Sequence, residues 1–259
     1  SPSQLKESGF KIGSIRKNIR FTYRKNEDDL REIFDLRLKG AKSSGRWLEA
    51  KNSDIMKDKY DNYARHVMAY CGSELVSSGR IVFNNGNKLR SEHIGYGVEL
   101  PQFLWKEGFA EISRLVVAKE FRGSDIFLGM LAEFAIIAAQ NQTRYLVLNC
   151  IDSLVPVYKK FGAKKLNKRF HTDFMENQAL NLLYMDIEKS ISGKMNFVAW
   201  SEVHDVQNYL SSINQSHRIN LFNRVRYLFL SKFSFLGKKI YKSFIYKKND
   251  SHKKKRGQS

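Results

Sequence analysis

Cysteine is scarce in this chain of 259 residues, which contains only Cys71 and Cys150. Two thiols provide neither a disulfide framework nor a cysteine-rich metal site, and the apolar run around Cys150 predicts a buried, inert thiol. The six histidines show no ligand spacing, so no metal is expected. No run of about 18 uncharged apolar residues is present, which argues against a membrane-spanning helix. The polar N-terminus predicts no signal peptide, and hence a cytoplasmic protein.

Acidic residues are few relative to basic ones: 26 Asp and Glu stand against 45 Lys and Arg, a net charge of +19. The excess is concentrated near the C-terminus, where residues 215–259 hold 13 basic residues and one acid, a net +12. The other 214 residues hold 32 basic and 25 acidic residues, only +7. A tail of this kind favours an anionic membrane surface, a nucleic acid or an acidic protein as partner.

Hydrophobic periodicity predicts a mixed α/β sheet with helices packed on it. The expected strands cover 19–25, two arms of a hairpin within 66–83, then 111–118, 144–151 and 180–188. The expected helices begin at 26–29, follow Pro101, cover 124–140 and end near Gly162. Four parts are predicted along the chain: an N-terminal segment (1–18), the α/β domain (19–190), a helical basic extension (191–248) and a disordered basic tail (249–259).

The stretch "LVVAKEFRGSDIFLGML" has the order strand, turn, helix. This order holds a phosphate at a helix N-terminus, where backbone N–H groups are unpaired and the helix dipole is positive. Asp125 and Phe127 stand where glycines are expected if the backbone is to approach a pyrophosphate closely. The turn therefore predicts a ligand with an anionic group other than a pyrophosphate.

Three segments, "EFRGSDIFLGML", "LVLNC" and "VPVYKKFGA", resemble the acetyltransferase superfamily known as GNAT. The segment from Glu111 to Arg114 leading into "LVV" is similar to one branch, the acyl-homoserine-lactone synthases and their relatives, the N-acyl amino acid synthases. So is the upstream set of Arg37, Trp47, Asp58 to Asp61 and Arg80. The resemblance covers roughly residues 19–190. It implies a GNAT-like acyltransferase fold and the transfer of an acyl group from a thioester to an amine.

The resemblance also assigns roles to particular residues. A backbone N–H on the fourth strand faces the thioester carbonyl, and this position corresponds to Leu115, Val116 or Val117. Tyr158 falls where a tyrosine lies near the departing sulfur; it is expected either to protonate the thiolate or to pack half-buried. Glu111 is a candidate base, directly or through water, with a structural ion pair to Arg80 as the alternative.

The acceptor and the donor are predicted in the same way. Arg80 and Arg114 suit the carboxylate of an acceptor, because guanidinium forks bind carboxylates. Arg37, Trp47 and Asp61 match the acceptor pocket of the branch, although Asp61 suits a solvated loop acid equally well. The turn is expected to hold a pantetheine arm through Arg122, Gly123, Ser124 and Phe127. The donor is then an acyl carrier protein thioester rather than acyl-coenzyme A, and no tightly bound cofactor is expected.

The segment 218–248 places large apolar residues three or four apart with Lys and Arg elsewhere, typical of a basic amphipathic helix. Such a helix lies on an anionic membrane, packs on the enzyme body or, less in keeping with this sequence, binds nucleic acid. The leading function is an N-acyltransferase that makes an N-acyl amino acid. The alternatives are a lactone-forming signal synthase, an acetyl-coenzyme A-dependent acetyltransferase and a non-catalytic adaptor.

Overall fold

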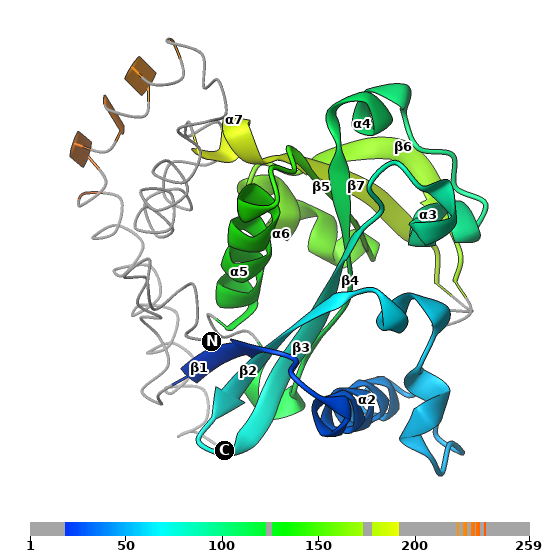
Figure 1. Ribbon diagram of the computed structural model, residues 1–259. Coiled ribbons are helices and arrows are strands. Elements are labelled where there is room, and N and C mark those ends of the chain that lie inside the picture. The colour runs from blue at the N-terminus through cyan, green and yellow to red at the C-terminus, as the bar shows by residue number, and fades with distance from the viewer. Residues whose placement is uncertain are drawn as a thin grey trace, which may run out of the picture.

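The computed structural model describes residues 19–122, 126–172 and 178–191, with eight further residues between 222 and 236. Its centre is a seven-stranded sheet in the order β1-β2-β3-β4-β5-β7-β6 (Figure 1). Only β4 and β5 run parallel to each other; the other neighbours are antiparallel. The strands are β1 (Ile19–Tyr23), β2 (Arg65–Cys71), β3 (Glu74–Phe83), β4 (Phe109–Val117), β5 (Tyr145–Cys150), β6 (Lys164–Phe170) and β7 (Leu180–Asp186).

Helices join these strands and cover both faces of the sheet. The α-helices are α2 (Glu27–Lys42), α3 (Glu92–Gly95), α4 (Gln102–Glu107), α5 (Ile126–Gln140), α6 (Val155–Lys160) and α7 (Ile187–Ile191). The 3₁₀ turns are η1 (Ser53–Met56), η2 (Lys59–Asn62), η3 (Lys88–Arg90), η4 (Lys119–Phe121) and η5 (Asp152–Leu154). Helix α2 begins where predicted, because the side chain of Asn26 accepts a hydrogen bond from the N–H of Asp29.

Alternation along β2 shows which helix covers which face. Val67 and Ala69 belong to the core cluster that contains α5, whereas Met68 and Tyr70 belong to the cluster that contains α2. Because successive side chains of a strand point to opposite faces, α2 and α5 lie on opposite sides of the sheet (Figure 1).

Strands β4 and β5 separate part-way along their length. Their register of paired residues ends at Ile112 and Leu148, yet β4 continues to Val117. Beyond Leu148, β5 remains paired with β7. Within the described residues the sheet therefore opens into a gap between the ends of β4 and β5.

A β-bulge lies next to this gap. The β3–β4 register shifts between Ser78 and Arg80, and Arg114 has φ +53°, a left-handed conformation that is uncommon for a residue other than glycine. Gly79 lies within the shift, where a Cβ atom would come within 2.8 Å of Phe134 Cζ. The bulge interrupts the simple alternation of side chains between Glu111 and Arg114.

The predicted mixed sheet is confirmed, and the structure adds an edge strand, β6, that was not predicted. Its sequence, KKLNKRF, is polar and mostly exposed, so it carries no apolar periodicity. The predicted parts 1–18 and 249–259 lie outside the described residues, as does nearly all of 191–248, and the domain boundaries stay predictions. Among the described helices, none is long and apolar enough to cross a membrane.

Candidate active site

A pocket of about 270 Å³ occupies the gap between β4 and β5. Its lining combines apolar side chains with polar and charged ones, and we call these two sets of lining residues the apolar end and the polar end. The apolar end is formed by Leu115, Val116, Leu148, Cys150, Leu154 and Tyr158. The polar end is formed by Arg37, Arg46, Glu92, Tyr96, Ser113, Arg114 and Asn149. A pocket of this kind suits a substrate with an aliphatic part and a charged head.

The strand wall of the pocket presents backbone groups. Val116 directs its carbonyl toward β3, where it accepts a hydrogen bond from Ser77 Oγ at 2.8 Å. Because backbone polar groups alternate along a strand, the N–H groups of Leu115 and Val117 point to the opposite edge, into the gap. The carbonyl of Val117 points the same way, since it accepts from Arg122 Nε at 3.3 Å.

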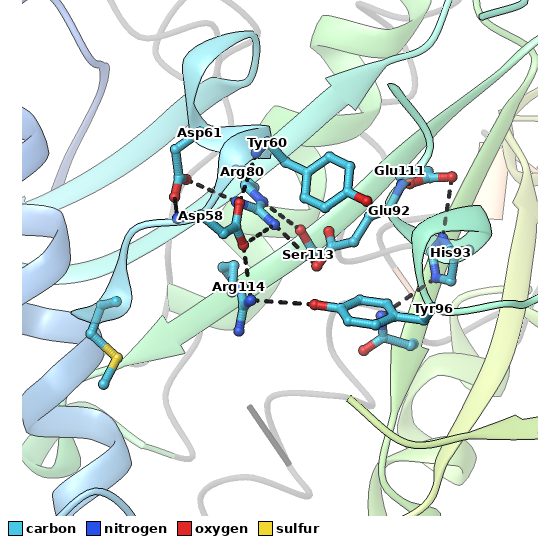
Figure 2. Close-up of polar contacts among 12 residues, drawn as sticks. Asp58, Tyr60, Asp61, Arg80, Glu92, His93, Tyr96, Glu111, Ser113 and Arg114 are labelled. Atoms are coloured by element: carbon cyan, nitrogen blue, oxygen red, sulfur yellow. Dashed lines mark hydrogen bonds and ion pairs between the residues drawn. The ribbon is translucent and has the colours of Figure 1, made fainter. Parts of the chain in front are cut away.

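Arg80 is the centre of the charged cluster behind the polar end (Figure 2). Its guanidinium donates hydrogen bonds to both carboxylate oxygens of Asp58, at 2.6 and 2.8 Å. The same group contacts Asp61 at 2.9 Å and Glu92 at 3.0 Å, and Nε donates to Ser113 Oγ at 2.8 Å. Together these contacts involve all three nitrogens of the guanidinium group. Burial would lower the pKa of Arg80, but the surrounding carboxylates outweigh burial and raise it.

Asp61 ties α2 to this cluster. Its oxygens accept two hydrogen bonds from Arg37, at 3.0 and 2.9 Å, and one contact from His66 Nε2 at 2.9 Å. Burial favours the neutral carboxyl, yet His66, Arg37 and Arg80 together hold the pKa of Asp61 well below its usual range. Asp61 is fully buried, so it is not a solvated loop acid.

The lowered pKa of Asp61 predicts how the free energy of unfolding falls at acidic pH. Asp61 has a lower pKa in the folded chain than in the unfolded chain, so its contribution is complete above about pH 4 and is lost as the pH falls toward the folded pKa. We expect Asp61→Asn to lower the free energy of unfolding at pH 7 by about 3–5 kcal/mol, and to flatten its fall below about pH 4. Urea titrations from pH 7 to pH 2 measure both effects. Asp28→Asn, at an exposed position in α2, is the matched control; an equally steep acid limb in Asp61→Asn would contradict the prediction.

Glu111 lies beyond the polar end, fully buried. Its carboxylate accepts from Ser91 Oγ at 2.5 Å and from the N–H of Glu92 at 2.6 Å, and His93 Nδ1 lies 3.3 Å away. Burial raises the pKa of this carboxyl, but His93, Ser91 and the Glu92 amide outweigh burial and lower it. Among the described residues it is Glu92, not Glu111, that forms the ion pair with Arg80.

Arg114 and Tyr96 close the polar end from the pocket side. Arg114 Nη2 lies 2.9 Å from Asp58 Oδ2 and 3.5 Å from the Tyr96 hydroxyl (Figure 2). Burial raises the pKa of Tyr96 to about 12, with a further contribution from Glu92. Arg46, half-buried in the same wall, has a lowered pKa because of burial and then because of the positive charges of Arg122 and Arg114.

At the apolar end, Tyr158 is buried and packs edge-on against Phe127, with ring centroids 5.4 Å apart. Burial, and next the neighbouring Cys150, raises the pKa of the Tyr158 hydroxyl. The turn before α5 is described only in part: Arg122 is exposed and donates from Nη2 to Ser43 Oγ at 2.7 Å. The predicted residues Gly123 and Ser124, and Asp125 beside them, lie outside the described residues.

The structure brings some predicted residues to the pocket and places others behind it. Arg37, Arg114, Leu115, Val116 and Tyr158 line the pocket. Arg80 and Asp61 support it from the buried cluster, and Trp47 packs beside α2. The prediction missed Glu92, Tyr96 and Arg46. Glu92 and Tyr96 come from a Gly- and Asn-rich loop with no periodic signal; the acid–histidine pair Glu92–His93 was the one chemical hint.

The model of one protein family, described as N-acyl amino acid synthase FeeM, matches residues 32–186. This match spans more than half of the chain. The chain belongs to the FeeM family. No curated protein matches it. The structure of FeeM itself, an N-acyl amino acid synthase from uncultured soil microbes, aligns with a TM-score of 0.54 at 10% identity, covering 68% of this chain and 94% of FeeM.

Two other solved structures align with this member of the FeeM family as well. The acyl-homoserine-lactone synthase LasI has a TM-score of 0.51 at 17% identity, over 68% of this chain and 96% of LasI. TofI, solved in a ternary complex with an inhibitor and MTA, has a TM-score of 0.52 at 16% identity, over 72% and 96% of the two chains. The predicted GNAT fold is confirmed, and the protein is an N-acyltransferase.

Proposed function

We propose that this enzyme transfers a fatty acyl chain from an acyl carrier protein thioester to the α-amine of an amino acid. The observation that carries the proposal is that a single pocket, at the gap between β4 and β5, is lined both by apolar side chains and by guanidinium and carboxylate groups. The family match supports the same chemistry. An N-acyl amino acid is the product.

The polar end suits a zwitterionic acceptor. Arg114 and Arg46 line it and offer guanidinium donors for a carboxylate. Arg114 is itself fixed by Asp58, which Arg80 holds bidentately. A rigidly held guanidinium is pre-organised, so it loses little freedom when the acceptor binds.

The apolar end suits the thioester. We propose that the carbonyl oxygen of the donor accepts from the N–H group of Leu115 or of Val117, which stabilises the oxyanion of the tetrahedral intermediate. Tyr158 then donates its proton to the departing thiolate. Its raised pKa keeps the phenol protonated at neutral pH, as a proton donor must be. For Glu111 we propose an indirect role, because its oxygens are occupied by Ser91, Glu92 and His93.

The donor proposal rests on the turn and on charge. In the sequence, Asp125 adds a negative charge to the turn and Phe127 a bulky side chain, where a backbone built to hold a pyrophosphate carries glycines; a carrier protein presents a single phosphodiester. Arg46 lines the pocket; burial lowers its pKa, and Arg122 is near enough to lower it further. Carrier proteins are acidic, so the basic body favours the encounter.

The test compares donors and acceptors directly. Purified enzyme is supplied with one fatty acyl group on acyl carrier protein or on coenzyme A, together with a mixture of amino acids or with S-adenosylmethionine, and mass spectrometry identifies the products. We expect N-acyl amino acids, formed far faster from the carrier protein. Equal rates from both donors would refute the carrier protein assignment, and product formed from S-adenosylmethionine alone would indicate a lactone synthase.

We further propose that the C-terminal extension docks on an anionic membrane. The described residues there, Phe222, Val225, Phe229, Phe233 and Leu236, are helical and 43–67% exposed. Their spacing of three or four places them on one helical face, within a segment whose net charge is +12. An apolar face with flanking cations binds anionic bilayers.

Vesicle sedimentation tests this second proposal. We expect the full chain to sediment with vesicles of phosphatidylglycerol and phosphatidylcholine, and to remain in solution with phosphatidylcholine alone. Phe229→Ser combined with Phe233→Ser is expected to weaken sedimentation strongly. The matched control is Phe103→Ser, which lies on the enzyme body in the cluster around α4. If the double variant sedimented like the wild type, the membrane proposal would fail. The remaining interpretation would be that the extension packs on the enzyme body or on another subunit.

A further inference from the structure

We propose that Glu92 is the carboxylate that binds the acceptor ammonium and removes its proton. This inference rests on the proposed function and names a catalytic residue for it. Neither the family match nor the sequence pattern singles out Glu92.

Glu92 combines burial, exposure to the pocket and an unused oxygen. Its side chain is only 3% exposed, yet it lines the pocket. Oε1 is paired with Arg80 at 3.0 Å. Oε2 is buried and has no hydrogen-bond partner among the described residues. A carboxylate oxygen that is buried without a donor is costly, and an ammonium group of a ligand in the pocket would supply one.

The position of Glu92 suits an amine. It lies beside Ser113 and Arg80 and on the same side of the cluster as Tyr96 and Arg114 (Figure 2). In an α-amino acid, one carbon separates the ammonium from the carboxylate. If the carboxylate contacts Arg114, the ammonium therefore lies in the same pocket as the Glu92 carboxylate.

The local charge balance supports a zwitterionic ligand. Three guanidinium groups, of Arg37, Arg80 and Arg114, face three carboxylates, of Asp58, Asp61 and Glu92. These six groups balance one another. Arg46 in the same lining adds a positive charge that suits the acceptor carboxylate, while Glu92 suits its ammonium.

The proton transfers balance with the reaction. Glu92 takes one proton from the ammonium, and the neutral amine attacks the thioester carbonyl, so that a C–N bond forms. When the C–S bond breaks, the thiolate takes a proton from Tyr158, and the second proton lost by the nitrogen restores that phenol. Glu92 finally releases its proton to solvent. One proton leaves in each turnover, and no oxidant or metal is required.

Glu111 positions Glu92 rather than acting in its place. The Glu111 carboxylate accepts from the backbone N–H of Glu92 at 2.6 Å and from Ser91 Oγ, which in turn accepts from the N–H of Ile94 at 3.2 Å. These contacts fix the first turn of α3, from which the Glu92 side chain projects. Glu111 does not appear in the described lining of the pocket.

The experiment compares two acceptors in wild type and in the near-isosteric variant Glu92→Gln. One acceptor is the preferred amino acid, whose amine is protonated at pH 7; the other is hydroxylamine, which is neutral at that pH and needs no base. We expect Glu92→Gln to lose about 10²–10⁴-fold in kcat/KM with the amino acid, the usual contribution of general-base catalysis. With hydroxylamine we expect a loss of less than about tenfold. The amino acid rate of the variant should also rise with pH as the free amine increases.

Two other variants separate catalysis from structure. Glu111→Gln is expected to lower the midpoint of thermal unfolding and to reduce the amino acid rate selectively but by a smaller factor than Glu92→Gln does, because the Glu92 carboxylate is still present and only less firmly held. Glu99→Gln, at an exposed position after α3, should leave both rates unchanged. Equal losses with both acceptors in Glu92→Gln would overturn the assignment of Glu92, and so would a selective loss in Glu111→Gln that exceeds the loss in Glu92→Gln. If wild type acylates no amine at all, it is the proposed function that fails.

Discussion

Replacing Arg80 by methionine is expected to lower the free energy of unfolding by about 3–5 kcal/mol, the cost of removing one partner from a buried ion cluster. Arg80 is fully buried and is the cation shared by Asp58, Asp61 and Glu92. Without it, these carboxylates are left close together with fewer donors. Urea unfolding at pH 7 measures the loss.

A matched substitution, Arg31→Met, removes an exposed arginine that lies 3.6 Å from Asp28, and should change stability by less than about 1 kcal/mol. The deficit of Arg80→Met should also shrink between pH 7 and about pH 4, because the carboxylates left without their cation become easier to protonate. A deficit below about 1 kcal/mol, or one that grows on acidification, would show that Arg80 does not hold the cluster together.

The second large effect is expected at Arg114, where a strained backbone and a functional side chain coincide. Arg114→Ala and Arg114→Gly should each lower kcat/KM for the amino acid acceptor by about 10²-fold, since both remove a charged donor to its carboxylate. Neither variant should lower kcat/KM for the corresponding decarboxylated amine, which has no carboxylate to bind. Steady-state rates with the two acceptors measure this difference.

The same pair of variants isolates the strain. At φ +53° a side chain costs about 1 kcal/mol that glycine does not. We therefore expect Arg114→Gly to be more stable than Arg114→Ala by about that amount, although it has the smaller side chain. Equal stabilities of the two variants would mean that the bulge does not strain the chain. If both variants lost activity equally with the amino acid and with the decarboxylated amine, Arg114 would not bind the acceptor carboxylate.

Periodic apolar residues predicted the sheet well because burial imposes them directly. The apolar run Leu115, Val116, Val117 predicted the strand that lines the pocket, which follows from local spacing. Tyr158 was predicted from the resemblance to the GNAT superfamily, through the segment "VPVYKKFGA". The Asn26 cap at the start of α2 is similarly local, since it depends on contacts three residues apart.

The charged half of the site could not be predicted in the same way. Glu92 comes from a short helix that is held by Glu111, 19 residues further along the chain, and by Arg80 on β3. The direction in which the Arg114 side chain points depends on the β-bulge between β3 and β4, and the apolar pattern of the strand does not predict that bulge. Both positions are set by contacts between distant segments, and such contacts leave no periodic trace in the residues concerned.

The separation of β4 from β5 has a consequence for isotope labelling. Within the part of the chain that the structure describes, the amides of Leu115 and Val117 have no neighbouring strand on their outer edge, so their hydrogens are open to deuterium although they lie in the middle of the sheet. A thioester bound as we propose would cover this edge, and deuterium uptake there should slow while that of the flanking strands stays constant. Deuterium uptake at these two amides would thus measure how much of the enzyme has donor bound, independently of the acceptor and without turnover.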